Sequence, residues 1–348
     1  MKLSSVTRHV HDRDRWLWAG VGLGALATGA AMQAVHVRRI SHDPEYEPLG
    51  APPQGQVRLV RSADGTILHA EVFGPEDGDT VVLAHGWTEA LQFWIYIIKA
   101  LSERGLRVVA YDQRGHGKSE PATGGDYGLE RFGEDLEAVL AACVPAGRQA
   151  VVAGHSLGAM SIVAWAADHD VPRRVGAAAL LNTGVGDLVA EQMLFPLPQI
   201  AQALNRTLAT RGFLGNRAPL PRFSTPLSSA MIRYVAFGPA ASPAQVAFYE
   251  RMLVTSPPDA RAKTGIAMSG MELHDALPRL TVPTIVIAGA EDRLTPPSHA
   301  RRIAGELPQL RRLTIMPDTG HMTPLERPDE VTRALVELLA LTGERVVV

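Results

Sequence analysis

The sequence predicts a doubly wound, mostly parallel α/β sheet with an inserted helical cap, preceded by one N-terminal transmembrane helix. Three observations support this fold class. Short apolar runs alternate with helix-length segments from residue 56 onward, a long stretch between Thr183 and Leu280 breaks that alternation, and the run from Trp16 to Val35 carries no charge. Runs that are apolar on both faces are typical of parallel strands buried between layers of helices.

The expected strands begin with a hairpin around Asp64-Gly65, formed by "QVRLVRS" and "TILHAEVFG". The runs "TVVLAHG", "RVVAYDQRG", "AVVAGHS", "AAALLNT" and "TIVIAGAED" follow, and a last strand precedes "PDTGHMTPLERP". Helical periodicity is clear in 129–144 and in 329–343, the second of which begins behind Pro328. Together these elements predict a core made of residues 56–183 and 281–342.

The stretch that interrupts the alternation, residues 184–280, is rich in proline and in apolar helical pieces such as "LVAEQMLFPLPQIAQAL". A structureless loop of that length is implausible inside a compact domain. We therefore expect a mostly helical cap over the sheet.

The N-terminus is expected to divide into a tail (1–15), a transmembrane anchor (16–36) and a Pro-rich extended linker (41–55). A helix of 20 residues spans about 30 Å, the thickness of the hydrocarbon core of a bilayer. Arginines bracket the uncharged run, and tryptophans stand at its start. These features predict a single-pass membrane protein with its catalytic domain on the extracytoplasmic side.

Two alternatives to an anchor remain open. A cleaved signal peptide would make the protein secreted, although the A-x-A pattern at Ala25-Leu26-Ala27 falls in the middle of the run. A helix buried in a soluble fold is the other alternative.

Composition excludes several function classes. The formal net charge is −2 and the basic residues are spread along the chain, so no basic block indicates a nucleic-acid partner. A single cysteine, Cys143, excludes an intramolecular disulfide and gives no support for a structural zinc site. Its expected role is that of a small buried hydrophobe.

The stretch "VVAGHSLGAM" contains the first candidate for chemistry. Gly154, Ser156 and Gly158 form G-x-S-x-G, the pattern of a nucleophile elbow, in which a sharp turn between a strand and a helix exposes a serine hydroxyl. The pattern arises by chance in many chains, but here an expected strand precedes it and an expected helix follows. That context favours Ser156 as a nucleophile.

A serine nucleophile needs a histidine base and a carboxylate that fixes the histidine tautomer. In this type of fold the acid and then the histidine follow the serine. Asp292 ends one expected strand and His321 lies in the turn after the next, so both are expected at the same edge of the sheet as Ser156. Glu291 remains a competitor for the role of the acid.

An oxyanion needs two backbone N–H donors aimed at one point, and the residues expected to supply them are Trp87 and Leu157. Gly86 would let the backbone approach the substrate closely. We expect structural roles for His85 and His155, which should point away from the pocket, and for His116, which lies in a turn.

The five pieces "HGW", "DQRGHGKS", "GHSLG", "GAEDRLTP" and "GHMTPLERP" resemble, in this order, the α/β-hydrolase superfamily, in the branch with a helical cap after the sixth strand. The resemblance covers roughly residues 56–342. It implies Ser156 as nucleophile, Asp292 as acid, His321 as base, Trp87 and Leu157 as oxyanion donors, and no metal or organic cofactor. Epoxide hydrolases and haloalkane dehalogenases of the superfamily carry aspartate at the elbow, so a serine there argues against those reactions.

The leading hypothesis is a serine esterase or lipase that acts on a small, lipophilic carboxylic ester through an acyl-serine intermediate. Acyl transfer, cofactor-free perhydrolysis and hydrolysis of a thioester, amide or carbon–carbon bond would use the same triad. A membrane-tethered binding protein without catalysis is a third hypothesis. The cap has few carboxylates that could bind a substrate amine, which weighs against an aminopeptidase.

Overall fold

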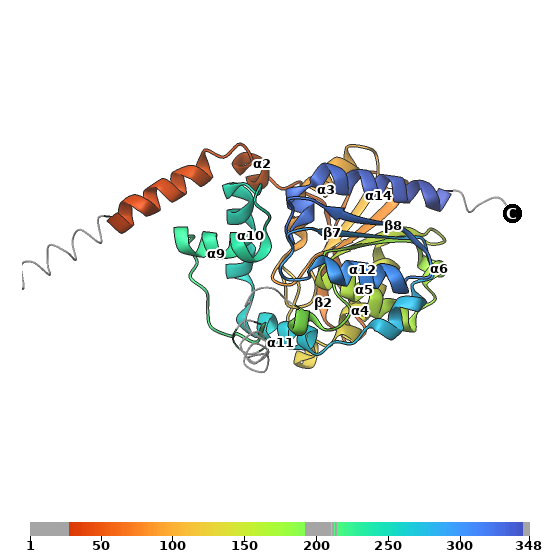
Figure 1. Ribbon diagram of the computed structural model, residues 1–348. Helices are drawn as coiled ribbons and strands as arrows, with labels where there is room; N and C mark the ends of the chain where they lie inside the picture. The colour runs from red at the N-terminus through yellow and green to blue at the C-terminus, as the bar shows by residue number, and fades with distance from the viewer. Residues whose placement is uncertain (1–27, 192–209, 211, 213, 344–348) are drawn as a thin grey trace, which may run out of the picture.

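An eight-stranded sheet forms the centre of the computed structural model, which describes residues 28–191, 210, 212 and 214–343 (Figure 1). Its strands follow the order β1-β2-β4-β3-β5-β6-β7-β8. The hairpin of β1 and β2 is antiparallel, β2 pairs antiparallel with β4, and all the other pairs are parallel. The prediction of a mostly parallel α/β sheet is confirmed. The strands are β1 Gln56–Arg61, β2 Ile67–Phe73, β3 Thr80–Ala84, β4 Arg107–Tyr111, β5 Ala150–His155, β6 Val175–Leu181, β7 Thr284–Gly289 and β8 Leu310–Met316.

Alternation along the strands divides the core into two layers. Val81 and Leu83 of β3 belong to a cluster that includes helix α3 (Ile95–Ser102) and helix α14 (Pro328–Gly343). Val82, between them, packs on the opposite face. That face is covered by α4 (Leu129–Cys143), α5 (Leu157–Asp168) and α12 (Pro297–Glu306), as Figure 1 shows.

The remaining short elements connect these layers. The hairpin turn has Gly65 at φ +92°, a left-handed conformation that favours glycine. Cys143 ends α4 as a buried free thiol. The connecting elements are η1 Leu91–Trp94, η2 Thr123–Gly125, α6 Val171–Arg174, η5 His274–Arg279 and α13 Thr323–Glu326.

Between β6 and β7 the described residues form helices and no strand. These helices are α7 (Leu188–Glu191), α9 (Pro226–Ala236), α10 (Pro243–Thr255) and α11 (Pro258–Ser269). Both α9 and α10 begin with a capping box and a proline in the first turn. Most of the apolar piece expected as a helix, residues 188–204, lies outside the described residues.

The segment before the sheet differs from the extended linker that its prolines suggest. A helix covers residues 28–41, and α2 (Tyr46–Gly50) follows it. Leu49 of α2 is buried in the core cluster, and Glu45 accepts hydrogen bonds from Ser242 Oγ (2.7 Å) and Gln245 Nε2 (3.1 Å) of the cap. Residues 42–50 therefore dock on the cap, because α10 supplies an apolar contact and polar partners that the local sequence does not reveal.

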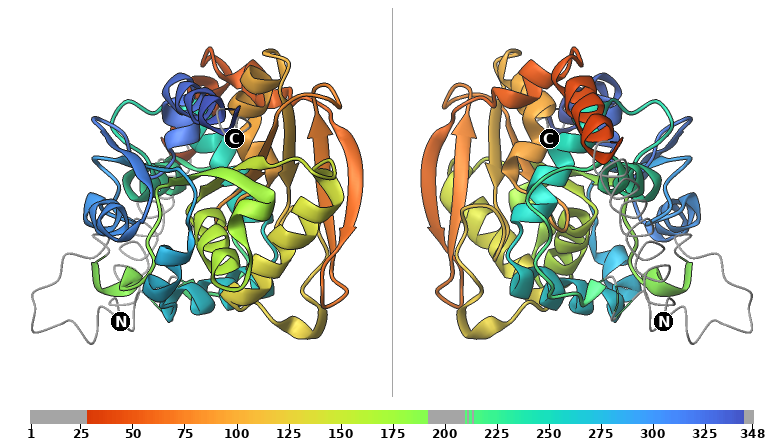
Figure 2. Two further views of the ribbon diagram at one scale, coloured as in Figure 1. Left: turned by 90° about the vertical axis from the view of Figure 1, so that its right-hand side faces the viewer. Right: turned by 90° about the vertical axis from the view of Figure 1, so that its left-hand side faces the viewer.

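The expected membrane anchor lies only partly within the described chain, since residues 16–27 fall outside it. Within the described residues, no helix is both long enough and apolar enough to cross a membrane. Figure 2 shows the helix of residues 28–41 on the side of the molecule that carries the cap.

Candidate active site

Ser156 occupies a strained turn between β5 and α5. Its backbone has φ 50° and ψ −114°, a conformation that is uncommon for a residue with a side chain. A Cβ atom on Gly158 would overlap the carbonyl of Ala84, and one on Gly154 would lie against the backbone of Gly158 and Ala159. The two glycines therefore let α5 start directly against β3 and β5, and this close approach fixes the turn that presents Ser156.

Asp292 and His321 meet at the same edge of the sheet. The His321 Nδ1–Asp292 Oδ2 distance is 2.8 Å, and both side chains are buried. The other carboxylate oxygen, Oδ1, accepts backbone N–H bonds from Leu294 and Thr295, each 2.9 Å long. Because Asp292 accepts from Nδ1, the lone pair of the neutral His321 ring lies on Nε2. Glu291 is exposed, and the structure does not bring it to His321.

The environment of this pair changes both pKa values. Burial alone would lower the pKa of His321, but the charge and hydrogen bond of Asp292 outweigh it and raise that pKa above its ordinary value of 6.5. Burial alone would raise the pKa of Asp292, but the charge of His321 and the hydrogen bonds from His321 and Asn182 hold it below its ordinary value of 3.8. Asp292 is therefore ionised at neutral pH.

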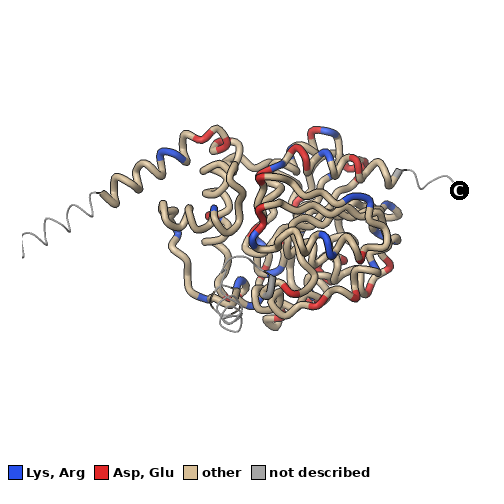
Figure 3. Tube along the Cα trace, viewed as in Figure 1, with Lys and Arg blue, Asp and Glu red and all other residues tan. Residues whose placement is uncertain are grey.

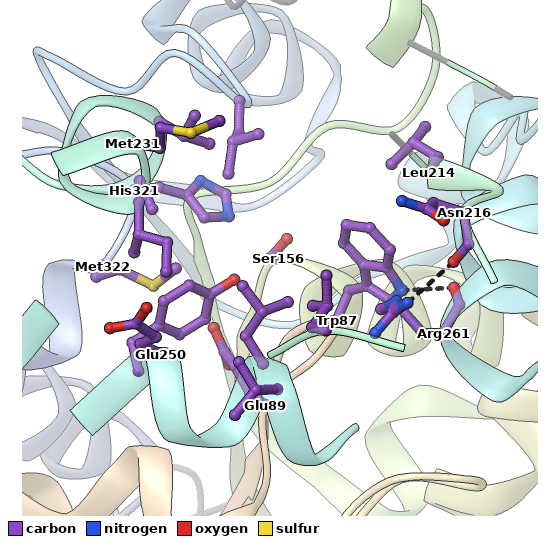
Figure 4. Close-up of a pocket in the computed structure, with 18 of the residues that line it drawn as sticks. Trp87, Glu89, Ser156, Leu214, Asn216, Met231, Glu250, Arg261, His321 and Met322 are labelled. Atoms are coloured by element: carbon purple, nitrogen blue, oxygen red, sulfur yellow. Dashed lines mark hydrogen bonds between the residues drawn. The ribbon is translucent and has the colours of Figure 1, made fainter. Parts of the chain in front are cut away.

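A cavity of about 500 Å³ connects Ser156 and His321 with the cap, and Figure 4 shows both side chains directed into it. No hydrogen bond joins these two described residues, and such catalytic bonds often form only when substrate is bound. The walls of the cavity are largely apolar and include Trp87, Met160, Leu214, Met231, Leu253 and Met322. The site can therefore accept an apolar group next to the serine hydroxyl.

The two expected oxyanion donors come from different elements, the start of α5 and the segment that follows β3. Leu157 is the first residue of α5, where backbone N–H groups have no partner within the helix. Trp87 lines the cavity, and its indole N–H donates to the Arg261 carbonyl of the cap at 2.9 Å. A Cβ atom on Gly86 would come within 2.8 Å of the Glu89 carboxylate and of the His155 ring, so Gly86 is also required by these two side chains.

Sequence reasoning missed Glu89, which lies beneath the site. Its carboxylate accepts the Gly86 N–H at 2.5 Å and lies 3.0 Å from His155 Nδ1. His155 Nε2 in turn donates to the His321 carbonyl oxygen at 2.8 Å. His155 is buried and does not line the cavity, which agrees with the structural role expected for it, and it also supports the loop that carries His321.

Three further polar residues hold the acid and the histidine loop. Asn182 donates to Asp292 Oδ2 at 2.9 Å and to the Gly320 carbonyl at 3.1 Å. Thr295 Oγ1 donates to Asp292 Oδ2 at 2.9 Å. Glu326 accepts the N–H groups of Gly320 and, in the cap, Gly238 (2.7 Å). Asn182 could have been suspected, because it follows an expected strand at the edge where the other site residues lie.

The remaining histidines that the sequence singled out have backbone partners. His85 Nε2 accepts the Gln113 N–H at 3.0 Å and its Nδ1 donates to the Gly86 carbonyl, an arrangement of a neutral ring. Burial lowers the pKa of His85 well below its ordinary value, and burial lowers that of His116 to about 4. Neither residue lines the cavity. No cluster of three or more potential metal ligands occurs among the described residues.

Relatives with similar sequences carry names of several activities. A protein of Variovorax paradoxus with the provisional name carbamate hydrolase RutD is 30% identical over 276 residues, which cover 78% of this chain and 96% of that protein. The non-heme chloroperoxidase of Streptomyces lividans is 29% identical, over 71% of this chain and 87% of the relative. The bifunctional esterase/perhydrolase DCH of Acinetobacter calcoaceticus is 24% identical, over 80% of this chain and 98% of the relative.

Solved structures with the same fold include a thermophilic esterase from Thermogutta terrifontis. It is 24% identical, with a TM-score of 0.65, and the match covers 82% of this chain and 99% of the esterase. A membrane phospholipase A described as a bacterial virulence factor is 23% identical with a TM-score of 0.65, over 95% of this chain and 99% of that one. The family model described as alpha/beta hydrolase fold matches residues 79–328, more than half of the chain. Together with the elbow at the carboxyl end of β5 and the cap between β6 and β7, this match shows that the chain belongs to the α/β hydrolase fold family.

Proposed function

We propose that this hydrolase cleaves carboxylic esters of lipophilic acids through an acyl intermediate on Ser156. The observation that carries the proposal is the ordered pair of His321 Nδ1 and Asp292 Oδ2, 2.8 Å apart, beside an elbow serine that opens into an apolar cavity. A carboxylate that fixes the histidine tautomer is needed only if the other ring nitrogen exchanges protons. The relative named bifunctional esterase/perhydrolase supports this reading.

In the proposed reaction, Ser156 Oγ attacks the ester carbonyl carbon while His321 Nε2 takes the hydroxyl proton. The N–H groups of Trp87 and Leu157 stabilise the negative oxygen that forms. When the carbon–oxygen bond breaks, His321 returns the proton to the leaving alcohol. Water then attacks the acyl-serine, gives a proton to His321, and releases the acid as Ser156 regains its hydrogen.

Labelling with a fluorophosphonate tests the nucleophile. Wild-type protein should react and lose esterase activity, and Ser156→Ala should neither react nor hydrolyse p-nitrophenyl esters, with turnover lower by about a million-fold. Ser161→Ala, in the helix that follows Ser156, is the matched control and should still be labelled, because the Ser161 hydroxyl is buried and bonded to Gln113 and to the Leu157 carbonyl. Persistent labelling of Ser156→Ala would refute the assignment.

The acyl preference follows from the cavity. Esters of graded chain length should show kcat/KM rising with chain length until the cavity of about 500 Å³ is filled. Each buried CH₂ group contributes about 0.8 kcal/mol, so each should raise kcat/KM by a factor of roughly four while space remains. A preference for acetyl over longer esters would contradict a lipophilic substrate.

Perhydrolysis is a second candidate, favoured by the relatives named chloroperoxidase and perhydrolase. Hydrogen peroxide would replace water in the second step and release a peracid. Peracid formation from an ester and peroxide, measured against hydrolysis of the same ester, separates the two activities.

The proposal includes attachment to a membrane through residues 16–36, with the catalytic domain on the extracytoplasmic side. The uncharged run from Trp16 to Val35 supports it. Anchored protein should stay in the membrane pellet through high salt and alkaline carbonate and dissolve in detergent. An intact mass that lacks about thirty N-terminal residues would show cleavage of a signal peptide instead.

A further inference from the structure

Large apolar side chains are exposed on two neighbouring segments of the cap side, six of them besides Val37. Met32 and Val35 belong to the helix of residues 28–41; Phe223, Leu227, Met231 and Tyr234 belong to α9 and the turn before it. The spacing of 227, 231 and 234 places these three on one side of α9. We call these six residues the apolar face; proteins that face only water rarely leave such a face uncovered.

Hydrogen bonds hold the two segments together. Gln33 Nε2 donates to the Ser224 carbonyl at 2.7 Å, and His36 Nε2 donates to Ser224 Oγ at 2.9 Å. The Ser224 hydroxyl in turn donates a hydrogen bond to the carboxylate of Glu250, a buried residue of α10, at 2.5 Å. The helix of residues 28–41 is therefore fixed to the start of α9, and the two segments lie side by side.

The charged residues within the two segments have one sign. Residues 28–41 and 226–236 contain no carboxylate, and their charged residues are Arg38, Arg39 and Arg233. Figure 3 shows the contrast with the sheet domain, where acidic and basic residues alternate. An apolar surface bordered by arginines matches the boundary between acyl chains and anionic headgroups, where the negative surface potential attracts basic side chains.

The face is continuous with the candidate active site. Phe223 and Met231 are exposed to solvent on one side and line the cavity of Ser156 on the other. The chain also enters the face from an uncharged segment, because the run that begins at Trp16 leads directly into the helix that carries Met32 and Val35. A molecule embedded next to this face would therefore have a path into the cavity.

We propose that the apolar face inserts into the headgroup region of an anionic phospholipid bilayer, so that the cavity receives acyl chains from the membrane. The docking of the apolar face on the membrane does not depend on the proposed catalytic function. The statement about acyl chains rests on the proposed function, and the experiments below separate the two.

A fluorescent label on Leu227 tests the docking directly. Cys143 is buried, so Leu227→Cys provides a single reactive thiol for an environment-sensitive NBD group. The matched control is Leu59→Cys on β1, with an exposure of 72% against 71% for Leu227. Full-length protein is reconstituted into vesicles of phosphatidylcholine and phosphatidylglycerol, with and without lipids that carry a nitroxide quencher.

The label at 227 should shift to the blue and be quenched at least several-fold more by nitroxide lipid than the label at 59. Equal quenching at the two positions would overturn the proposal even if the N-terminus anchors the protein. A blue shift at 227 that appears without vesicles and grows with protein concentration would show that a second copy covers the face, and would also overturn it.

An activity measurement separates docking from chemistry. Leu227 does not line the cavity, so Leu227→Glu should keep the rate on a water-soluble short ester. The same variant should lose about ten-fold or more of its rate on an ester carried in vesicles, whereas Leu59→Glu should lose little. Equal loss on both substrates would contradict the role of the face. Absence of hydrolysis in the wild type, with the labelling result intact, would reject the proposed function alone.

Discussion

Glu89 and His155 form a buried pair, with a carboxylate oxygen 3.0 Å from Nδ1, directly behind the residues that would carry out catalysis. The other nitrogen of His155 donates to the carbonyl of His321. The ring centroids of His155 and His321 are 4.9 Å apart in an edge-on arrangement. The residue before the elbow serine thus connects β5 with the loop that holds the base. A negative charge at Glu89 also helps to raise the pKa of His321.

This relationship predicts the effect of Glu89→Gln. The amide can still accept the Gly86 N–H and can donate to His155, so the loop should keep its conformation. The negative charge is lost, and the apparent pKa on the acidic side of the kcat/KM profile should fall. Glu291→Gln, which changes an exposed carboxylate nearby, is the matched control and should leave the profile in place. An unchanged profile in Glu89→Gln would remove its electrostatic role.

The pH dependence of the wild type follows from His321. The base must be neutral, and its pKa is raised above 6.5 by Asp292, so kcat/KM should increase with pH through an apparent pKa above 6.5. The same shift stabilises the folded protein when the pH lies below the pKa of His321 in the unfolded chain, about 6.5. This contribution is lost as the pH rises through the pKa of His321 in the folded protein. A profile that is already flat at pH 6 would contradict the assignment of His321.

Asp292→Asn should keep the fold and lower turnover by about ten-thousand-fold, because the amide holds the wrong histidine tautomer. It also removes the charge that raises the pKa of His321, so any residual activity should titrate at lower pH. Measurement of kcat for this variant beside Glu291→Gln decides between the two acids. A larger loss in Glu291→Gln would contradict the geometry at the end of β7.

Gly158→Ala should disturb the elbow. Its Cβ would overlap the Ala84 carbonyl, which is backbone of the central strand β3 and has little freedom to shift. We expect a loss of about 1–3 kcal/mol, a Tm lower by several degrees, and loss of fluorophosphonate labelling. Gly270→Ala is the control, since nothing lies within 4 Å of a Cβ there. Equal melting of the two variants would show that the close approach is not needed.

The docked N-terminal segment gives a further prediction. Leu49 is 2% exposed and packs in the main core cluster, so Leu49→Ala should cost about 2–5 kcal/mol. A chain that begins at Gln56 lacks this contact and the Glu45 hydrogen bonds to α10, and its Tm should fall similarly. A chain that begins at residue 42 keeps both and loses only the contacts of residues 28–41, such as those with Ser224, so its Tm should lie between those of the full-length protein and the shortest chain. Thermal denaturation of the three proteins tests this; an unchanged Tm in the shortest one would refute it.

Local patterns predicted the parts of the molecule whose structure is decided locally. The strands from β3 to β7 are apolar on both faces, and the elbow needs glycines at fixed positions beside Ser156, so both are visible in the sequence. The sequence does not mark Glu89 as a site residue, because its role depends on His155 of β5, which only the fold brings near. The prolines around Leu49 favour an extended linker, whereas the surface on α10 that this segment contacts lies about two hundred residues further along the chain and leaves no local pattern.

The backbone N–H of His321 donates to the carbonyl of Ala236, the last residue of α9, at 2.8 Å. The carboxylate of Glu326, at the end of α13, accepts a second hydrogen bond from the backbone N–H of Gly238. This attachment restricts how the enzyme can be redesigned. In a chimera that takes its cap from another hydrolase, the donor segment must end before residue 236. A donor segment that extends beyond residue 238 would replace the backbone that positions His321. The walls of the cavity can therefore be exchanged without a change in catalytic geometry only in the part of the cap that precedes the Ala236 carbonyl.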